Sequence, residues 1–141
     1  MDSPHHWLMK TEPGTFAWSD LVHRGTDPWD GVRNAQARNH IRAMAVGDLA
    51  LIYHSGDQRR IVGVARVASI PYPDPTSDDP RWVVVDVEPL QALPRPVTLA
   101  DVKADPVLST LAIVRQPRLS VAPVTSEQFE RVLEIGGIDE G

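Results

Sequence analysis

Short blocks of apolar residues recur along the chain and predict strands. The block 6–10 (HWLMK) predicts a first strand, and the nearly all-apolar block 49–54 (LALIYH) predicts a strand that is covered on both faces. Gly63 lies inside another such block and marks a bend or the close approach of another segment. Further strands are predicted at 61–70, 81–88 and 119–124.

Polar capping residues followed by helical spacing of apolar residues predict short helices. Asn34 is the predicted N-cap of a helix that ends near Met44. Ala37, Ile41 and Met44 recur at helical spacing and form the predicted buried stripe of this helix. The other predicted helices are 20–23 after the cap Ser19, 98–104 with the cap Thr98, and a closing helix in which Thr125 and Gln128 form a capping box and Phe129, Val132 and Leu133 are buried.

The order of these elements indicates a fold class. The chain of 141 residues has the length of one ordinary domain, and we expect a single domain over 1–141. Helices separate the strands early and late, and hairpin-like turns join them in the middle. This order predicts the α+β class, with a mixed, largely antiparallel sheet curled into a small barrel and flanked by short helices.

Charge is distributed unevenly along the chain. The formal net charge of −5 argues against a protein that coats nucleic acid through bulk charge. The segment 24–66, however, carries seven Arg against four Asp, a net charge of +3 that leaves −8 for the remainder. We expect this segment to line one face of the molecule, with Arg33, Arg38 and Arg42 near the mouth of a binding pocket.

Other compositional features restrict the classes of protein. The chain has no Cys, which excludes a disulfide framework, a thiolate zinc site, a Cys nucleophile and an iron–sulfur cluster. The first six residues lack the basic start and the apolar stretch of a signal peptide. No apolar run approaches the ~20 residues that span a bilayer. We therefore expect a cytoplasmic protein without a membrane partner.

Known catalytic and metal-binding patterns are absent from the sequence. It contains no glycine-rich phosphate loop, no G-x-S-x-G and no H-E-x-x-H. His5 and His6 are neighbours that point to opposite faces of a strand, so they do not easily join His40 and His54 at one ion, and we predict no metal and no cofactor. Glu12 and His54 form either a general acid–base pair or a buried hydrogen-bonded pair that orders a pocket, and the second is favoured.

Two stretches are hard to explain by packing alone, namely 10–13 (KTEP) and 29–39 (WDGVRNAQARN). The second combines an indole, a tight turn, two Arg and a helix N-terminus, whose free N–H groups attract anions. Trp29 offers a stacking face to a flat ligand. This pattern predicts a site for a flat ligand that carries a phosphate or a carboxylate. The alternative makes Trp29 a core anchor and Asn34 only a cap, and composition leaves the two readings equal.

Seven motifs follow one another over nearly the whole chain. They are WLMKTEP at 7–13, WDGVRN at 29–34, QARN at 36–39, VGD at 46–48, YHS at 53–55, YPDPT at 72–76, and RLSV at 118–121 with PVT at 123–125. In these motifs the chain resembles the EVE domain family, a branch of the PUA-like superfamily that also includes YTH domains. Thr11 stands where the family usually has Ser, and Ala35 where it usually has an aromatic residue.

The resemblance implies a PUA-like barrel with a concave pocket, and related domains insert a modified base of RNA or DNA between aromatic side chains. Trp29 is then expected to stack on the base and to border a cavity, because Trp7 and Trp82 lie in predicted strands and are better core candidates. Tyr53 is the expected second wall. The ligand-binding residues predicted in this way are Lys10, Arg33 and Arg38 for phosphate, Thr11, Gly31 and Asn34 for the base edge, Glu12 and His54 for orientation or an exocyclic amine, Trp29 and Tyr53 for stacking, and Asn39 beside them.

The main functional prediction is a monomeric binding module whose partner is a nucleic acid with a modified base. One alternative is an enzyme of the ASCH type that acts on RNA or on a modified nucleoside through Lys10, Glu12 and His54. A second alternative is a sensor of a free nucleoside or of a small anion, with no polymer involved. Turnover would favour the first alternative, and equal affinity for mononucleosides and oligonucleotides would favour the second.

Overall fold

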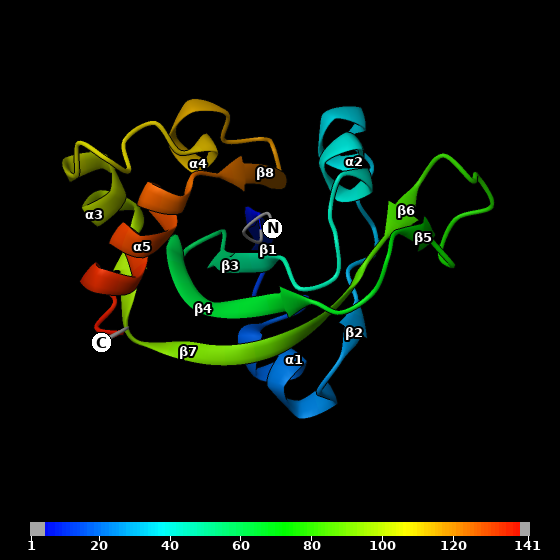
Figure 1. Cartoon of the computed structure of the whole chain (residues 1–141), viewed down its shortest axis with the longest axis horizontal. Helices are drawn as coiled ribbons and strands as arrows, with labels where there is room; N and C mark the ends of the chain where they lie inside the picture. Colours follow the sequence, from blue (N-terminus) through cyan, green and yellow to red (C-terminus); the bar gives the residue numbers. More distant parts are fainter. Residues whose placement is uncertain (1–4, 139–141) are drawn as a thin grey trace.

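The computed structural model describes residues 5–138 of the chain. Figure 1 shows its elements in the order of the sequence. They are β1 (His6–Thr11), α1 (Trp18–Arg24), β2 (Asp27–Pro28), α2 (Ala35–Arg42), β3 (Leu49–His54), β4 (Arg60–Val67), β5 (Tyr72–Pro73), β6 (Val83–Val84), β7 (Asp86–Thr98), α3 (Leu99–Ala104), α4 (Ala112–Arg115), β8 (Val121–Val124) and α5 (Ser126–Ile135).

One curled sheet organises the molecule. Its strand order is β2-β7-β4-β3-β1-β8, in which β1 and β3 are parallel and the other pairs are antiparallel. The long strands β4 and β7 sweep around below β3, with α2 toward one end of the sheet and α3, α4 and α5 toward the other (Figure 1). The short strands β5 and β6 pair with each other beside α2. The predicted α+β class, with a mixed and largely antiparallel curled sheet, is confirmed.

The sheet is buried on both faces because successive residues of its central strands belong to different hydrophobic clusters. In β1, Trp7 and Met9 pack in one cluster, and Leu8 between them packs in the other. In β3, Ile52 belongs to the first cluster and Leu51 to the second. This alternation follows from the two-residue period of a strand. The prediction that 49–54 is covered on both faces is confirmed.

Buried Asp48 fixes the start of β3 beside β1. Its carboxylate accepts hydrogen bonds from the His5 backbone N at 3.1 Å, the Trp7 indole Nε1 at 3.0 Å and the Ala45 backbone N at 2.9 Å. A buried carboxylate costs free energy unless its oxygens are hydrogen-bonded, and this one is bonded by three donors. It therefore sets the register in which the parallel strands begin.

The predicted helix caps are largely confirmed. The Asn34 side chain accepts a hydrogen bond from the Ala37 backbone N at 2.9 Å and begins α2. Thr98 and Thr125 form capping boxes with Asp101 and Gln128 at the starts of α3 and α5. The first helix begins at Trp18 instead of after Ser19, because the Asp20 carboxylate accepts the hydrogen bond of the Ala17 backbone N.

The strand predicted at 81–88 is wrong in its limits. Trp82 is half-buried and precedes β6, which has only two residues, while the long strand β7 begins at Asp86 and continues to Thr98. Three prolines within 89–96 disfavour a strand in the sequence, since Pro cannot donate a ladder hydrogen bond. The pairing of β7 with β4 shifts register at two places, and these irregularities accommodate the prolines.

Candidate functional site

A cavity of about 450 Å³ opens between the end of β1, the turn that follows it and the segment 27–33. Six predicted site residues line this cavity. They are Lys10, Thr11, Glu12, Trp29, Gly31 and Arg33. The two stretches that the sequence singled out, 10–13 and 29–39, therefore meet at one place, although only the first part of the second stretch reaches the cavity.

The aromatic wall of the cavity consists of Trp29 and Phe16. Their ring centroids are 6.1 Å apart and their planes are nearly perpendicular. Trp29 is only 7% exposed and belongs to a hydrophobic core cluster, whereas Phe16 packs against that cluster and is partly exposed. The guanidinium of Arg24 lies 5.5 Å from the Phe16 centroid and forms an ion pair with Asp27 at 2.9 Å. Trp29 is thus both a core anchor and a cavity wall, so the two readings of the sequence are compatible.

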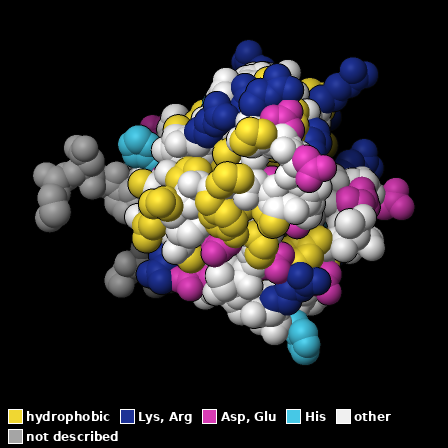
Figure 2. All heavy atoms as spheres, turned by 90° about the vertical axis from the view of Figure 1, so that its right-hand side faces the viewer, with side chains coloured by type: hydrophobic (Ala, Val, Ile, Leu, Met, Phe, Trp, Pro, Cys, Tyr) yellow, Lys and Arg dark blue, Asp and Glu magenta, His cyan; other side chains and the backbone are white. Residues whose placement is uncertain are grey.

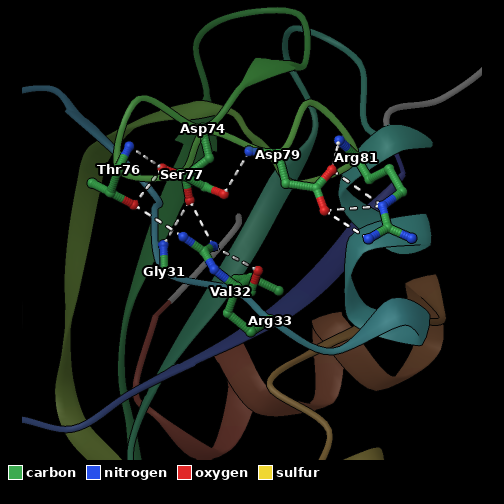
Figure 3. A network of polar contacts seen from close by, with 8 residues as sticks. All are labelled: Gly31, Val32, Arg33, Asp74, Thr76, Ser77, Asp79 and Arg81. Carbon is green, nitrogen blue, oxygen red and sulfur yellow. Dashed lines mark hydrogen bonds and ion pairs between the residues drawn. The ribbon is translucent and has the colours of Figure 1, made fainter.

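Buried Asp74 holds the cavity rim from outside. Figure 3 shows its carboxylate at the centre of a network that includes Gly31, Arg33 and Thr76. It accepts hydrogen bonds from the Gly31 backbone N at 3.0 Å, from Arg33 Nη1 at 2.9 Å, and from the backbone N and Oγ1 of Thr76 at 2.7 and 2.6 Å. Gly31 has a φ of +79°, a conformation in which glycine is favoured. The rim is therefore a glycine turn clamped by a distant carboxylate.

The hydrogen bonds on Asp74 keep it ionised. Burial alone raises the pKa of its carboxyl, but the bonds from Thr76, Gly31 and Arg33 outweigh burial and lower the pKa to about 2. The opposite occurs at Asp30 on the cavity wall, where burial and the nearby charges of Asp74 and Asp27 raise the pKa. The two carboxylates therefore differ in role, since Asp74 is fixed in structure and Asp30 faces the cavity with no hydrogen bond to its side chain among the described contacts.

Polar groups of both signs complete the cavity. Lys10 donates a hydrogen bond from Nζ to the Pro117 carbonyl, and burial lowers its pKa. The Thr11 hydroxyl donates to the Phe16 carbonyl at 2.7 Å and so closes the turn that presents Phe16. Glu12 is exposed and accepts a hydrogen bond from Ser55 Oγ at 3.4 Å. The arrangement offers hydrogen-bond donors and acceptors around one aromatic corner, which suits a flat ligand with a polar edge.

Five predicted site residues do not line this cavity. Tyr53 is 4% exposed and packs in the other hydrophobic cluster, because its side chain leaves β3 on the face opposite to Ile52. Tyr53 therefore forms no second wall of this cavity, and Phe16 stands beside Trp29 instead. Four other predicted residues are also absent from its lining, namely Asn34, Arg38, Asn39 and His54. Asn34 caps α2, and Arg38 bonds to Asn39 and lies over Trp82.

His54 is engaged on both ring nitrogens. Nε2 accepts a hydrogen bond from the Trp18 backbone N at 3.0 Å, and Nδ1 lies 2.8 Å from Gln58 Oε1. Nε2 therefore carries no proton, and Nδ1–H is the donor to Gln58. Neither nitrogen contacts Glu12, so no acid–base pair exists between the two side chains. His54 orders the start of α1 against the end of β3.

The sequence reading missed Phe16, Arg24 and Asp74. Asp74 stood inside the YPDPT motif, but its role in bonding Gly31 depends on a contact across forty-three positions. Phe16 carried no signal beyond its place after the KTEP stretch. Within residues 5–138 no three His, Cys, Asp or Glu side chains are grouped to hold a metal ion. No helix in that range is long and apolar enough to cross a membrane.

The sequence pattern of the EVE domain matches residues 5–135. The chain belongs to the EVE domain family. Human thymocyte nuclear protein 1 is 34% identical over an alignment of 165 positions that covers 92% of this chain and 73% of the human protein. Among solved structures, a protein of Agrobacterium tumefaciens is 40% identical with a TM-score of 0.94, and the superposition covers 97% of this chain and 96% of the other.

Two further structures place this EVE domain among its relatives. One is a crystal structure of human THYN1 in complex with 5-methylcytosine-containing DNA. The human chain is 34% identical in sequence, and the superposition has a TM-score of 0.86 and covers 96% of this chain and 99% of the human one. The ASCH protein of Zymomonas mobilis is 12% identical with a TM-score of 0.60 over 93% of this chain and 95% of that one. The second likeness shows a shared fold alone.

The comparisons also correct the expected location. The similar curated proteins of human and mouse are both named thymocyte nuclear protein 1. The prediction of a cytoplasmic protein is wrong on this finding. Its premise was the lack of a signal peptide, which separates secreted from non-secreted proteins and does not separate the cytoplasm from the nucleus.

Proposed function

We propose that this EVE domain is a binding module that takes one modified base of a nucleic-acid strand into its cavity. The observation that carries the proposal is the cavity itself, with the Phe16 and Trp29 rings on one side and Lys10, Glu12 and Asp30 around it. Its volume of about 450 Å³ lies within the range of ligand sites in proteins. The complex of human THYN1 with 5-methylcytosine-containing DNA supports a modified base as the ligand.

The chemistry of the cavity fits a base that is turned out of a strand. An aromatic wall is worth about 1–3 kcal/mol per stacked base, which offsets the few kcal/mol needed to unstack and flip it. Carboxylates such as Glu12 and Asp27 accept hydrogen bonds from an exocyclic amine, and Lys10 donates to a ring nitrogen or a carbonyl. A base offers such donors and acceptors on one edge and apolar faces on both sides.

Binding without turnover is the favoured activity. The enzyme alternative depended on Lys10, Glu12 and His54 acting together. His54 does not line the cavity, and its two ring nitrogens bond to Trp18 and Gln58. The three groups that the enzyme alternative requires do not meet at the cavity, which Lys10 and Glu12 line without His54. The geometry therefore favours recognition.

The test is a binding titration with short single strands that carry one 5-methylcytosine, one cytosine or one abasic site at the same position. We expect the strand with 5-methylcytosine to bind best and the abasic strand to bind worst. Phe16→Ala should weaken binding of the methylated strand by about 5- to 150-fold, which corresponds to the loss of one stacking contact. Tyr53→Phe is the matched control, because Tyr53 is an aromatic residue outside the cavity.

Equal affinity for the abasic and methylated strands would show that no base enters the cavity. The same conclusion would follow if Phe16→Ala and Tyr53→Phe bound alike. Trp29→Ala is less informative, since Trp29 belongs to the core and its truncation should cost about 3–5 kcal/mol of folding free energy.

A further inference from the structure

Trp82 and three Arg side chains form a surface beside the cavity, which we call the Trp82 surface (Trp82, Arg33, Arg38 and Arg42). The guanidinium carbon of Arg33 is 5.7 Å from the Trp82 ring centroid, and that of Arg38 is 5.4 Å from the same centroid. Both distances are within the range of a cation–π interaction. Arg42 Nη2 donates a hydrogen bond to the Arg81 carbonyl at 3.1 Å, so α2 is joined to the segment that carries Trp82.

The positive charge of this surface is only partly neutralised. Arg33 forms an ion pair with Asp74 at 2.9 Å. Arg38 and Arg42 have no ion-pair partner in the part of the chain that the structure describes. The carboxylate of Asp79 is held by Arg81, whose hydrogen bonds are the main cause of its pKa of about 2, while the charge of Arg38 is the smallest cause. Two unpaired guanidinium groups therefore stand one helical turn apart on α2.

This arrangement costs folding free energy unless an anion binds there. Like charges four residues apart on a helix repel by a few tenths of a kcal/mol, and α2 contains no acidic residue to offset them. The contact of Arg38 with Trp82 and the bond of Arg42 to the Arg81 carbonyl hold these side chains in place but do not neutralise their charges. Phosphates that accept hydrogen bonds from the two groups would offset the repulsion.

Stacking on Trp82 leaves the guanidinium edges available. A guanidinium that lies over a ring interacts through its face and keeps its N–H donors in its own plane. Arg38 donates from Nε and Nη2 to Asn39 Oδ1, at 3.3 and 3.2 Å, and its Nη1 donates no hydrogen bond to another residue within 5–138. Trp82 is thus a positioning residue. It restricts the conformations of Arg33 and Arg38 before a ligand binds, so these long side chains lose less conformational entropy on binding.

The Trp82 surface is continuous with the cavity. Arg33 lines the cavity and also lies over Trp82, so the surface begins at the cavity rim. From there it follows α2, where Arg38 and Arg42 are separated by about 6 Å along the helix axis. Figure 2 shows Lys and Arg side chains gathered at the top of this face, where α2 lies, above a patch of hydrophobic side chains.

The expected positive face is therefore only partly present. Of the seven Arg in 24–66, the three around Trp82 share one surface. Arg24 pairs with Asp27 at the cavity, and Arg66 on β4 pairs with Glu88 on β7. The net charge of a sequence segment did not distinguish paired from unpaired side chains. Position beside Trp82, and not the lack of an ion pair alone, defines the surface, because Arg33 pairs with Asp74 and Arg59 and Arg60 form no ion pair within residues 5–138.

We propose that the Trp82 surface binds the phosphates of the nucleotides that flank the base in the cavity. The inference rests on the proposed function of the cavity and adds the part of the ligand that lies outside it. Arg38 and Arg42 bind successive phosphates, and Trp82 orients Arg33 and Arg38 toward the strand. The ligand is therefore an oligonucleotide strand with its backbone crossing α2, and a free nucleoside fills only part of the site.

The test compares a 5-methylcytosine oligonucleotide with the nucleoside 5-methylcytidine over a series of salt concentrations. Arg38→Gln should weaken binding of methylated and unmethylated strands alike and lower the slope of log affinity against log salt by about 0.7, the value for one phosphate of a single strand. Binding of the nucleoside should be unchanged. Trp82→Leu should act in the same direction, and Trp82→Phe should restore most of the affinity. Arg95→Gln is the matched control, because Arg95 is exposed on β7 away from this surface.

The outcomes distinguish a failure of the surface proposal from a failure of the cavity proposal. If the strand binds but Arg38→Gln and Trp82→Leu leave affinity and salt slope as in Arg95→Gln, the surface proposal is wrong and the cavity proposal stands. If the nucleoside binds as tightly as the strand, the surface proposal is also wrong. If the wild-type protein binds no strand of any kind, both are wrong. Thermal unfolding of every variant shows whether a loss of binding reflects a loss of fold.

Discussion

Asp74 is the single residue on which the geometry of the cavity rim depends most. It lies on the segment between β5 and β6, yet it bonds to the backbone of Gly31 and to the side chain of Arg33. Arg33 in turn belongs both to the cavity and to the Trp82 surface. One buried carboxylate therefore fixes the relative positions of the cavity and the proposed phosphate site.

The low pKa of Asp74 predicts a loss of stability in acid. Its pKa is about 2 in the folded protein, below the value of about 3.9 in an unfolded chain, so the ionised form stabilises the fold. The contribution, roughly 2 kcal/mol, is complete above about pH 4 and is lost as the pH falls toward 2. Asp74→Asn should accordingly be less stable than wild type at pH 7, with a difference that shrinks on acidification, as measured by urea unfolding at a series of pH values.

Asp78→Asn is the control for this prediction, since Asp78 is an exposed residue of the same segment. It should match the wild type at every pH. A stability difference for Asp74→Asn that stays constant from pH 7 to 2 would mean that the ionisation of Asp74 does not stabilise the rim.

At the scale of single residues, the sequence predicted which two stretches form the site better than it predicted the contacts of individual side chains. Trp29 and Lys10 were placed in one site because they belong to two unusual stretches, and they do line one cavity. Tyr53 and His54 were placed there too, but the period of β3 turns Tyr53 to the opposite face, and His54 is engaged by Trp18 and Gln58. The position of Trp82 depends on the pairing of β5 with β6, which two-residue strands do not signal.

At the scale of elements, α1 packs on the curled sheet through a contact that needs a glycine. A Cβ atom built on Gly63 of β4 meets the Trp18 ring at 2.6 Å. The sequence predicted a close approach at Gly63, and the ring of Trp18 is the group that approaches. Trp18 also donates its backbone N–H to His54, so this contact joins α1 to β4 and to β3.

Gly63→Ala should displace Trp18 and lower the free energy of unfolding by about 1–3 kcal/mol, as expected for overpacking. Gly14→Ala provides the comparison, because an added Cβ there meets nothing within 4 Å. Thermal or urea unfolding of the two variants measures the difference. Equal stability would imply that the half-buried Trp18 ring moves aside without cost.

Element types were predictable where one local signal dominated. The strands at 6–10 and 49–54 and the caps Asn34, Thr98 and Thr125 all follow from the residues themselves. Strand β7 did not, because its three prolines are tolerated only through register shifts against β4. Those shifts depend on the curvature of the whole sheet, which no local stretch encodes.

At the scale of the whole molecule, stability should be graded from the centre of the sheet outward. β3 lies between β4 and β1 and is buried on both faces, whereas β5 and β6 pair only with each other over two residues. Backbone amides of Leu51 and Ile52 should therefore exchange with solvent only on global unfolding, and amides of 72–84 should exchange faster. Hydrogen exchange followed by NMR or mass spectrometry measures this. Equally slow exchange in both regions would contradict the gradient.

The parallel pairing of β1 with β3 also bears on the order in which the protein folds. β3 and β4 meet across a short turn, whereas β1 and β3 meet only when the segment 12–48 has closed between them. Loop closure of that length has an entropic cost that delays such contacts. The same segment carries Phe16, Trp29 and α2, so the walls of the cavity come together in the step that pairs β1 with β3. A nascent chain that ends before β3 consequently has no ligand site, however complete its local motifs are.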